Sequence, residues 1–244
     1  MLVDQEDLLF TVTAITDDPV WGYTLKVLLE NRTDKDLMFS LRGTSVNGYM
    51  CDPFFAATVT AGMKANKDIS FSKEDFQSIG ITEVTDVTFT LRVYDSNDIS
   101  ADAVLEEEFV VYPTGKENTR DYPRQSQDTD IVLFENEACA MIITGFPESK
   151  LWGFQAQVYL VNKTQQTLMF SVGDAAINGF MCDPFFAQSV APGKRCITAL
   201  TWTRDALSQN GIGSVHQLSL PVRVYEADNW LSDALVNETF TVDL

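Results

Sequence analysis

The sequence predicts an all-β protein built as two tandem immunoglobulin-like antiparallel β-sandwiches, each with one short helix. The first observation is a long internal repeat: residues 21–111 align with residues 152–242 without a gap, and 32 of 91 positions are identical. A period this long, seen twice, indicates two copies of one domain. The second observation is that apolar residues recur at every other position, in short runs separated by turn residues. Seven or eight such runs per copy favour a sandwich.

The repeat also predicts the domain boundaries. We expect the first sandwich at residues 1–113 and the second at residues 131–244, because each copy is long enough to bury its own core. Residues 114–130 lie between them and show no apolar periodicity. Such a composition is typical of a polar, mobile linker.

The strands follow in order along each copy. In the first copy they begin near Leu8, Trp21 and Leu37, and the run with the strongest alternation is 87–94. We expect one face of each strand to be buried and the other to face solvent. In the second copy Pro221 interrupts the equivalent strand. Because proline has no N–H to donate, we expect that strand to have an open or bulged side there.

One short helix interrupts the strands of each copy. Ser72 and Thr203 are typical N-cap residues, and Gly80 and Gly211 are typical helix ends. Three segments, beginning at Asn31, Asn162 and Asn237, have the Asn-x-Thr form of an N-glycosylation site. The alternative interpretation of these segments is a plain hairpin turn.

The most similar part of the two copies is a nonapeptide, residues 47–55 and 178–186, in which a single position differs: Tyr49 is replaced by Phe180. Asn-Gly at its start predicts a tight turn, and Asp-Pro predicts a second bend five residues later. We expect the phenylalanine pairs that follow to be buried. The alternative hypothesis is that these aromatic residues and Asp52 or Asp183 hold a sugar or a peptide.

Composition excludes several functions. The chain has 17 basic and 35 acidic residues, a net charge of −18, which repels phosphate backbones and disfavours nucleic-acid binding. No apolar run approaches the roughly 20 residues of a transmembrane helix, and no secretory signal is visible. The protein is therefore either cytoplasmic or a chain whose export segment is missing from this sequence.

Cysteine and histidine leave little room for metal or nucleophilic chemistry. Cys51 and Cys182 occupy equivalent positions and fit buried apolar sites, whereas Cys139 and Cys196 leave open a disulfide bond within the second copy. His216 is the single histidine, and no Cys/His spacing resembles a zinc site. Asp52 and Asp183 lack a partner carboxylate at fixed spacing. We therefore assign no catalytic residue and expect no enzyme activity.

An acidic loop precedes the last strand of each copy. Carboxylates are the oxygen ligands that calcium prefers, and this loop supplies three in each copy: Asp95, Asp98 and Asp102, then Glu226, Asp228 and Asp233. The spacing differs from that of an EF-hand, so a solvated hairpin is the alternative. The same loop carries apolar residues at its tip, Ile99 in the first copy and Trp230-Leu231 in the second, which are candidates for ligand recognition.

Three repeated blocks carry a family resemblance: Leu37–Ser40 with Leu168–Ser171, the nonapeptide, and Leu91–Asp95. They resemble tandem Ig-like β-sandwich repeats of unknown function in exported, lipoprotein-type proteins of gut Gram-positive anaerobes. They are more distantly similar to a small secreted immunogenic sandwich protein of mycobacteria. The resemblance implies an extracellular or cell-surface protein without a known activity, although no lipid-attachment cysteine is visible.

Together these observations predict a non-catalytic exported interaction or structural module of a bacterium, with an unknown protein or glycan as its partner. The alternative is a calcium- or carbohydrate-binding module that uses the acidic and aromatic loops. Neither the oligomeric state nor the packing of the two repeats follows from the sequence.

Overall fold

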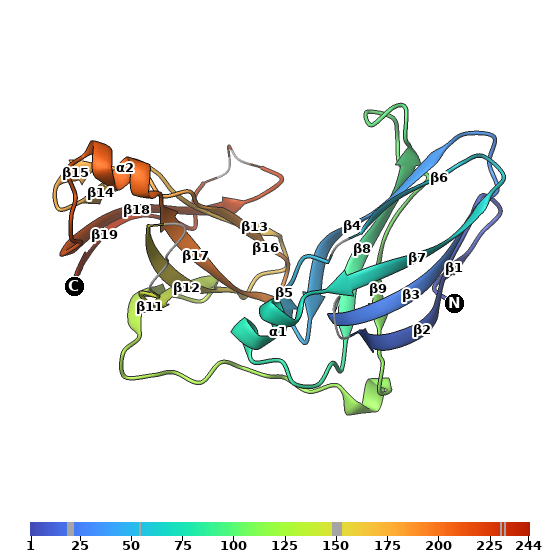
Figure 1. The fold of residues 1–244 in the computed structure, drawn as a ribbon, viewed down its shortest axis with the longest axis horizontal. Coiled ribbons are helices and arrows are strands. Elements are labelled where there is room, and N and C mark those ends of the chain that lie inside the picture. Colours follow the sequence, from blue (N-terminus) through green and yellow to red (C-terminus); the bar gives the residue numbers. More distant parts are fainter. Residues whose placement is uncertain (19–21, 54, 148–152, 230, 232) are drawn as a thin grey trace. The chain divides into compact units, whose positions relative to one another are not determined.

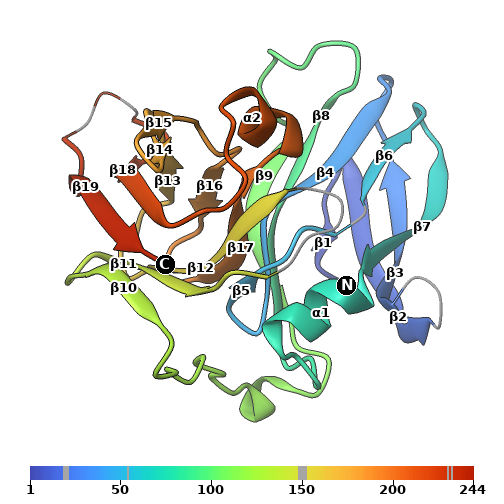
Figure 2. The same cartoon turned by 60° about the vertical axis from the view of Figure 1, so that its left-hand side comes forward.

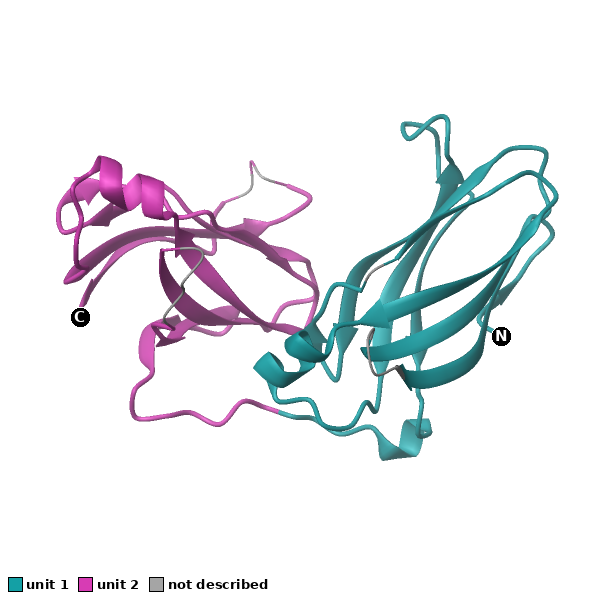
Figure 3. Ribbon diagram, viewed as in Figure 1, with its two compact units in different colours: residues 1–122 teal, residues 123–244 magenta. Residues whose placement is uncertain are grey.

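The protein is described here by a computed structural model that covers residues 1–18, 22–53, 55–147, 153–229, 231 and 233–244. These residues are mostly in strands, with two short α-helices, which confirms the all-β class. The chain forms two compact units, Met1–Tyr122 and Pro123–Leu244 (Figure 1, Figure 3). Their boundary falls inside the predicted linker 114–130. None of the described helices is long and apolar enough to span a lipid bilayer.

The first sheet of unit 1 contains four antiparallel strands in the order β1-β2-β3-β7. These are β1 (Val3–Asp4), β2 (Leu8–Asp18), β3 (Gly22–Asn31) and β7 (Lys64–Phe71). In both ribbon views β2, β3 and β7 run side by side (Figure 1, Figure 2). Alternate residues of β3 are buried, as the apolar periodicity predicts.

The second sheet of unit 1 is built around β4 and shares a core with the first sheet. Its strands are β5 (Tyr49–Met50), β4 (Leu37–Val46), β8 (Val87–Asp95) and β9 (Leu105–Val111), with β6 (Ala56–Val59) paired to β4. Phe10 of β2 and Phe89 of β8 are both fully buried, and their ring centroids are 6.1 Å apart. Apolar side chains of both sheets therefore meet in one core.

Unit 2 has two sheets of the same kind. The first has the order β10-β11-β12-β17, and its strands are β10 (Ile131–Glu135), β11 (Cys139–Gly145), β12 (Phe154–Asn162) and β17 (Arg195–Trp202). The second has the order β15-β14-β18-β13-β16, with β19 paired to β18; its strands are β15 (Phe180–Met181), β14 (Ala176–Ile177), β18 (Gln217–Glu226), β13 (Leu168–Val172), β16 (Ala187–Val190) and β19 (Val236–Asp243). Phe134 and Phe240 connect the two sheets, with ring centroids 5.7 Å apart.

The predicted proline effect is visible in β18. In unit 1, β4 continues along β8 with a single irregularity. In unit 2 the equivalent stretch is divided into β13 and β14, and the gap lies opposite Pro221. The Pro221 carbonyl accepts a hydrogen bond from Gly173 N, so the Pro221 nitrogen faces the same side. Because that nitrogen has no hydrogen, the ladder is interrupted there.

The two short helices begin at the predicted caps. Helix α1 (Lys73–Ile79) follows Ser72, whose hydroxyl accepts a hydrogen bond from Asp75 N, and it ends at Gly80 in the left-handed conformation. Helix α2 (Arg204–Gln209) follows Thr203, whose hydroxyl accepts from Ala206 N. The cap of α2 is Asn210, one residue before the predicted Gly211.

All four cysteines are buried free thiols, so the disulfide alternative for Cys139 and Cys196 is not realised. Burial raises the pKa of Cys139 to about 11. The predicted linker 114–130 contains a short 3-10 helix, Lys116–Asn118, in unit 1. In its unit 2 part, the Arg124 guanidinium donates two hydrogen bonds of 2.6 Å to the Asp130 carboxylate, so these residues have defined internal contacts.

Candidate functional site

The first half of each nonapeptide is a tight hairpin, as predicted. Asn47 and Asn178 have φ of 50° and 51°, and the following glycines also have positive φ, which is the geometry of a two-residue hairpin turn. The side-chain amide of each asparagine binds the loop that precedes the long strand β8 or β18. In unit 2, Asn178 Oδ1 accepts from His216 N at 2.9 Å and its Nδ2 donates to the Ser214 carbonyl at 2.7 Å.

The second half of the unit 2 nonapeptide is fixed by two further contacts. Trp202 is fully buried, and its indole nitrogen donates to the Cys182 carbonyl at 2.8 Å. Asp183 Oδ1 accepts from Ala175 N at 2.7 Å. Burial, followed by the nearby Asp183 charge, raises the pKa of the Cys182 thiol. A thiol with a raised pKa is a poor nucleophile at neutral pH, so Cys182 has a structural role.

The expectation that the phenylalanine pairs are buried is wrong for Phe185, whereas its neighbour Phe186 is half-buried. In unit 2, Phe180, Met181 and Phe185 are 54%, 62% and 87% exposed. We call these three residues the nonapeptide patch. In unit 1, by contrast, Tyr49, the counterpart of Phe180, is 2% exposed. Phe54, the counterpart of Phe185, lies outside the described residues. β15, which carries Phe180 and Met181, lies at the edge of its sheet. The Phe185 N–H donates to the Thr201 carbonyl of β17, but the Phe185 side chain faces solvent.

The two nonapeptides differ at one residue, and this residue makes a hydrogen bond in unit 1 that its counterpart cannot make in unit 2. The Tyr49 hydroxyl donates to the Tyr122 carbonyl at 2.7 Å, in the segment after the last strand of unit 1. Phe180 stands at the equivalent position and has no hydroxyl to make such a bond. The Tyr-to-Phe change therefore coincides with the change from a buried ring to an exposed one.

The two nonapeptide aspartates lie at the surface. Asp52 and Asp183 are both exposed, and Asp183 uses one carboxylate oxygen to hold its own loop. They belong to different units, one in each copy. Their placement makes Asp183 part of the frame of the nonapeptide patch.

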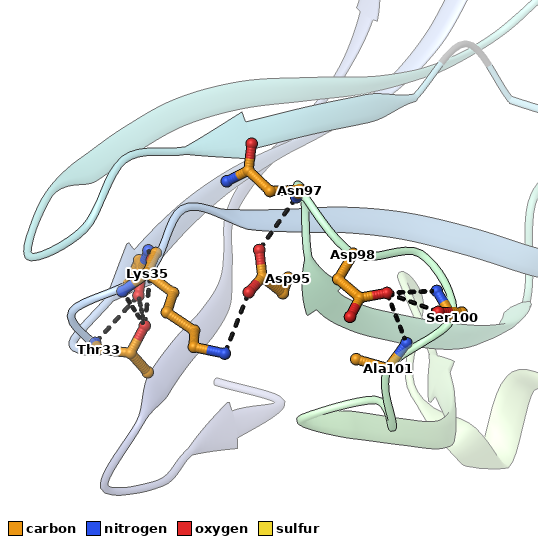
Figure 4. Close-up of polar contacts among 8 residues, drawn as sticks. Thr33, Lys35, Asp95, Asn97, Asp98, Ser100 and Ala101 are labelled. Carbon is orange, nitrogen blue, oxygen red and sulfur yellow. Dashed lines mark hydrogen bonds and ion pairs between the residues drawn. The ribbon is translucent and has the colours of Figure 1, made fainter.

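The acidic loop of unit 1 uses two of its carboxylates internally (Figure 4). Asp95 accepts from Asn97 N at 3.0 Å and pairs with Lys35 at 3.1 Å. Asp98 accepts from the backbone and hydroxyl of Ser100 and from Ala101 N. The Asn97 backbone bond and Lys35 lower the pKa of Asp95, and the Ser100 bonds lower the pKa of Asp98.

The remaining predicted metal ligands are exposed carboxylates: Asp102 in unit 1 and Glu226, Asp228 and Asp233 in unit 2. Among the described residues, no three Asp, Glu, His or Cys side chains are close enough together to hold a metal ion. The hydrogen bonds of Asp95 and Asp98 explain the geometry of the unit 1 loop, because each carboxylate caps a turn of that loop.

The tips of these loops do expose apolar side chains. Ile99 is 68% exposed and Leu231 is 74% exposed. Trp230, the other predicted recognition residue, lies outside the described residues. The loop tips thus form a second exposed apolar feature, distinct from the nonapeptide patch.

Each unit also has a hollow beside its short helix, which the sequence analysis did not predict. In unit 1 the hollow has a volume of about 460 Å³ and is lined by Tyr23, Phe76 and Ile81 among others. Burial raises the pKa of Tyr23 to about 12. The hollow of unit 2 has about 390 Å³ and is lined by Leu207 and Ile212, the residues equivalent to Phe76 and Ile81.

One contact resembles half of a hydrolase site. Ser214 Oγ and His216 Nε2 are 2.8 Å apart, but both residues are exposed and lie in one turn. Within the described part of the chain, no carboxylate is hydrogen-bonded to the imidazole to orient it, as a catalytic triad requires. The contact is explained by the turn that Asn178 holds.

Comparison with known proteins gives remote likenesses. No protein-family model and no curated protein matches the chain. The crystal structure of the YadV chaperone aligns with 98% of this chain and 100% of its own, at 12% identity and a TM-score of 0.26. Red sea bream transglutaminase aligns with 99% of this chain and 31% of its own, at 12% identity and a TM-score of 0.25. Similarity at this level indicates neither a fold family nor an activity.

The most distinctive surface is therefore the nonapeptide patch of unit 2. It combines three large exposed apolar side chains within six residues with a rigid frame made by Asn178, Asp183 and Trp202. A rigid apolar surface of this kind can bind a partner without ordering a loop first.

Proposed function

We propose that this protein is a non-catalytic interaction module, a tandem of Ig-like β-sandwiches exported to the surface of a Gram-positive bacterium. Its partner is a protein that contacts the nonapeptide patch. The exposure of Phe180, Met181 and Phe185 is the observation that carries this proposal. Exposed apolar side chains that lie close together in the chain can mark an interaction site, and the hairpin that carries them is hydrogen-bonded to the loop at Ser214 and to Trp202 of β17.

The contrast between the two copies supports the same proposal. If the nonapeptide served the fold alone, its apolar side chains would be buried in both units. Instead Tyr49 is buried in unit 1 while its counterpart Phe180 is exposed in unit 2. Phe180 is more than half exposed and contributes little to the core, which favours a role in binding.

The alternative proposal places a carbohydrate or calcium site at the loops before the last strands. The exposure of Ile99 and Leu231 favours it, since apolar side chains at loop tips are common in recognition sites. Calcium binding would require Asp95 and Asp98 to give up hydrogen bonds within their own loop. The alternative therefore has less support than the nonapeptide patch.

One screen distinguishes the two proposals. The full chain is tested on a displayed peptide library and on a glycan array, with and without calcium. Two matched variants accompany it: Phe180→Ser with Phe185→Ser, and Ile99→Ser with Leu231→Ser. All four substituted residues are exposed, so we expect both variants to fold like the wild type.

We expect peptide binders of the wild type to be lost with the first variant and retained with the second. Glycan binding that is lost with the second variant alone would support the loop proposal instead. Binders that both variants retain would exclude both surfaces.

A further inference from the structure

The edge strand β15 has a free outer side. β14 and β15 form a two-residue hairpin in which Ile177 is opposite Phe180 and Ala176 is opposite Met181. The next pair outward is joined by the bond from Cys182 N to the Ala175 carbonyl. In an antiparallel hairpin bonded and non-bonded pairs alternate. Met181 therefore points its N–H and carbonyl away from β14.

Strand β15 carries an exposed apolar side chain on each of its two faces. Successive side chains of a strand point to opposite faces, so Phe180 and Met181 flank the free backbone groups of the edge from the two sides. Each is more than half exposed. In the described part of unit 2, β15 pairs with β14 alone. An edge with free backbone groups and flanking apolar side chains is a site where an added strand binds.

The small size of this edge favours a peptide over a second copy of the chain. A stable protein–protein interface buries roughly 800 Å² on each partner, which is more than three side chains and a two-residue strand provide. A second copy would also bring a net charge of −18 against −18, which opposes association. In unit 1, moreover, the ring equivalent to Phe180 is contacted by an irregular polypeptide segment through Tyr122.

The negative charge of the protein indicates that the peptide carries basic side chains. The segment 173–187 carries Asp174 and Asp183, both exposed, and contains no lysine, arginine or histidine. The net charge of −18 favours basic side chains on the peptide and disfavours acidic ones. We propose, on the basis of the proposed function, that unit 2 binds an extended peptide of alternating basic and apolar residues by adding it as a strand to β15.

The test uses synthetic peptides and the full chain. Two fluorescent peptides of about ten residues, one alternating lysine with valine and one alternating glutamate with valine, are titrated with the protein by fluorescence anisotropy. We expect the lysine peptide to bind about tenfold more tightly or better than the glutamate peptide, and its affinity to fall as salt is added. Equal affinities would overturn the charge assignment.

Three variants with unchanged net charge locate the site. Phe180→Ser with Phe185→Ser removes two side chains of the patch, and we expect roughly tenfold weaker binding. Met181→Pro removes the outward N–H without touching the ladder to β14, whereas Met181→Ser removes the side chain and keeps that N–H. We expect the proline variant to bind more weakly than the serine variant. If Met181→Pro and Met181→Ser bind the lysine peptide with equal affinity, the proposal that the peptide adds to β15 as a strand is wrong.

Two further outcomes would identify another occupant. If no peptide binds but a display library of folded proteins yields binders that need Phe180 and Phe185, the proposed interaction module is supported and the peptide proposal is wrong. If sedimentation shows dimers that Phe180→Ser with Phe185→Ser abolishes, the occupant is a second copy. Either result would overturn the peptide proposal while leaving the patch as an interaction surface.

Discussion

Single residues in this protein explain why short motifs recur in both copies. Asn31 is fully buried, and its Nδ2 donates to the carbonyls of Lys35 and Val59 at 2.7 and 2.8 Å. Its Oδ1 accepts from both the backbone and the hydroxyl of Thr33. Asn162 makes the same set of bonds in unit 2. The first two Asn-x-Thr segments are therefore turns held by a buried amide, as the plain-turn alternative predicted.

Replacing this amide should be costly for stability. We expect Asn31→Ala to lower the free energy of unfolding by about 2–4 kcal/mol, because two carbonyls and one N–H lose their partner in a buried site. Urea unfolding followed by circular dichroism measures the change. Asn237→Ala is the matched control: it lies in the third Asn-x-Thr segment but is exposed, so its effect should stay within about 0.5 kcal/mol. Similar effects of the two substitutions would contradict this role of Asn31.

At the scale of elements, most strands follow from apolar periodicity, but the contacts between strands do not. Gly22 begins β3, and Gly153 directly precedes the equivalent strand β12; their φ angles are +81° and +93°. A Cβ at Gly22 would lie 2.2 Å from the carbonyl oxygen of Phe71, at the end of the neighbouring strand β7. The sequence shows a glycine at this place in both copies. The neighbouring strand that requires it becomes known only from the sheet order.

We expect Gly22→Ala to destabilise unit 1 by about 3 kcal/mol or more, because a backbone carbonyl cannot move aside without breaking the sheet. Gly62→Ala is a control with similar backbone geometry, since its φ is +69° and no atom lies within 4 Å of the added Cβ. Its expected loss is about 1 kcal/mol, from the left-handed conformation alone. Thermal melts of the two variants give the comparison. A loss of equal size in both would show that the close approach is unimportant.

At the scale of the whole molecule, the chain divides between Tyr122 and Pro123, and the residues after this boundary belong to unit 2. The Arg124 guanidinium lies 5.9 Å from the ring centroid of Tyr159 in β12 and binds Asp130 with two hydrogen bonds. Asp130 also accepts from Gln127 N. Composition predicts a polar linker here, but a pairing of two particular side chains is invisible to composition.

This pairing predicts a dependence of stability on pH. Arg124 lowers the pKa of Asp130 to about 2, below the value of roughly 3.9 for an unfolded chain. The folded state therefore favours the ionised carboxylate. The contribution of the Arg124–Asp130 pair to the free energy of unfolding is complete above about pH 4 and is lost as the pH falls through about 2.

The measurement is urea unfolding of the wild type and Asp130→Asn between pH 2 and pH 7. We expect the wild type to be more stable than Asp130→Asn near neutral pH. The difference between their free energies of unfolding should shrink towards pH 2. Asp128→Asn, an exposed residue of the same segment, should show no such trend. A difference in the free energy of unfolding that does not change with pH would contradict the stabilising role of the Arg124–Asp130 ion pair.

The sequence by itself determined the all-β class, the helix caps, the Asn-Gly hairpins and the interruption at Pro221, because each depends on local backbone chemistry or on a period of two. Tertiary structure decided which apolar residues face solvent. Two nearly identical nonapeptides have different exposures, since burial depends on what covers a residue and not on the residue itself. For the same reason, the nonapeptide patch could not be predicted from the repeat that contains it.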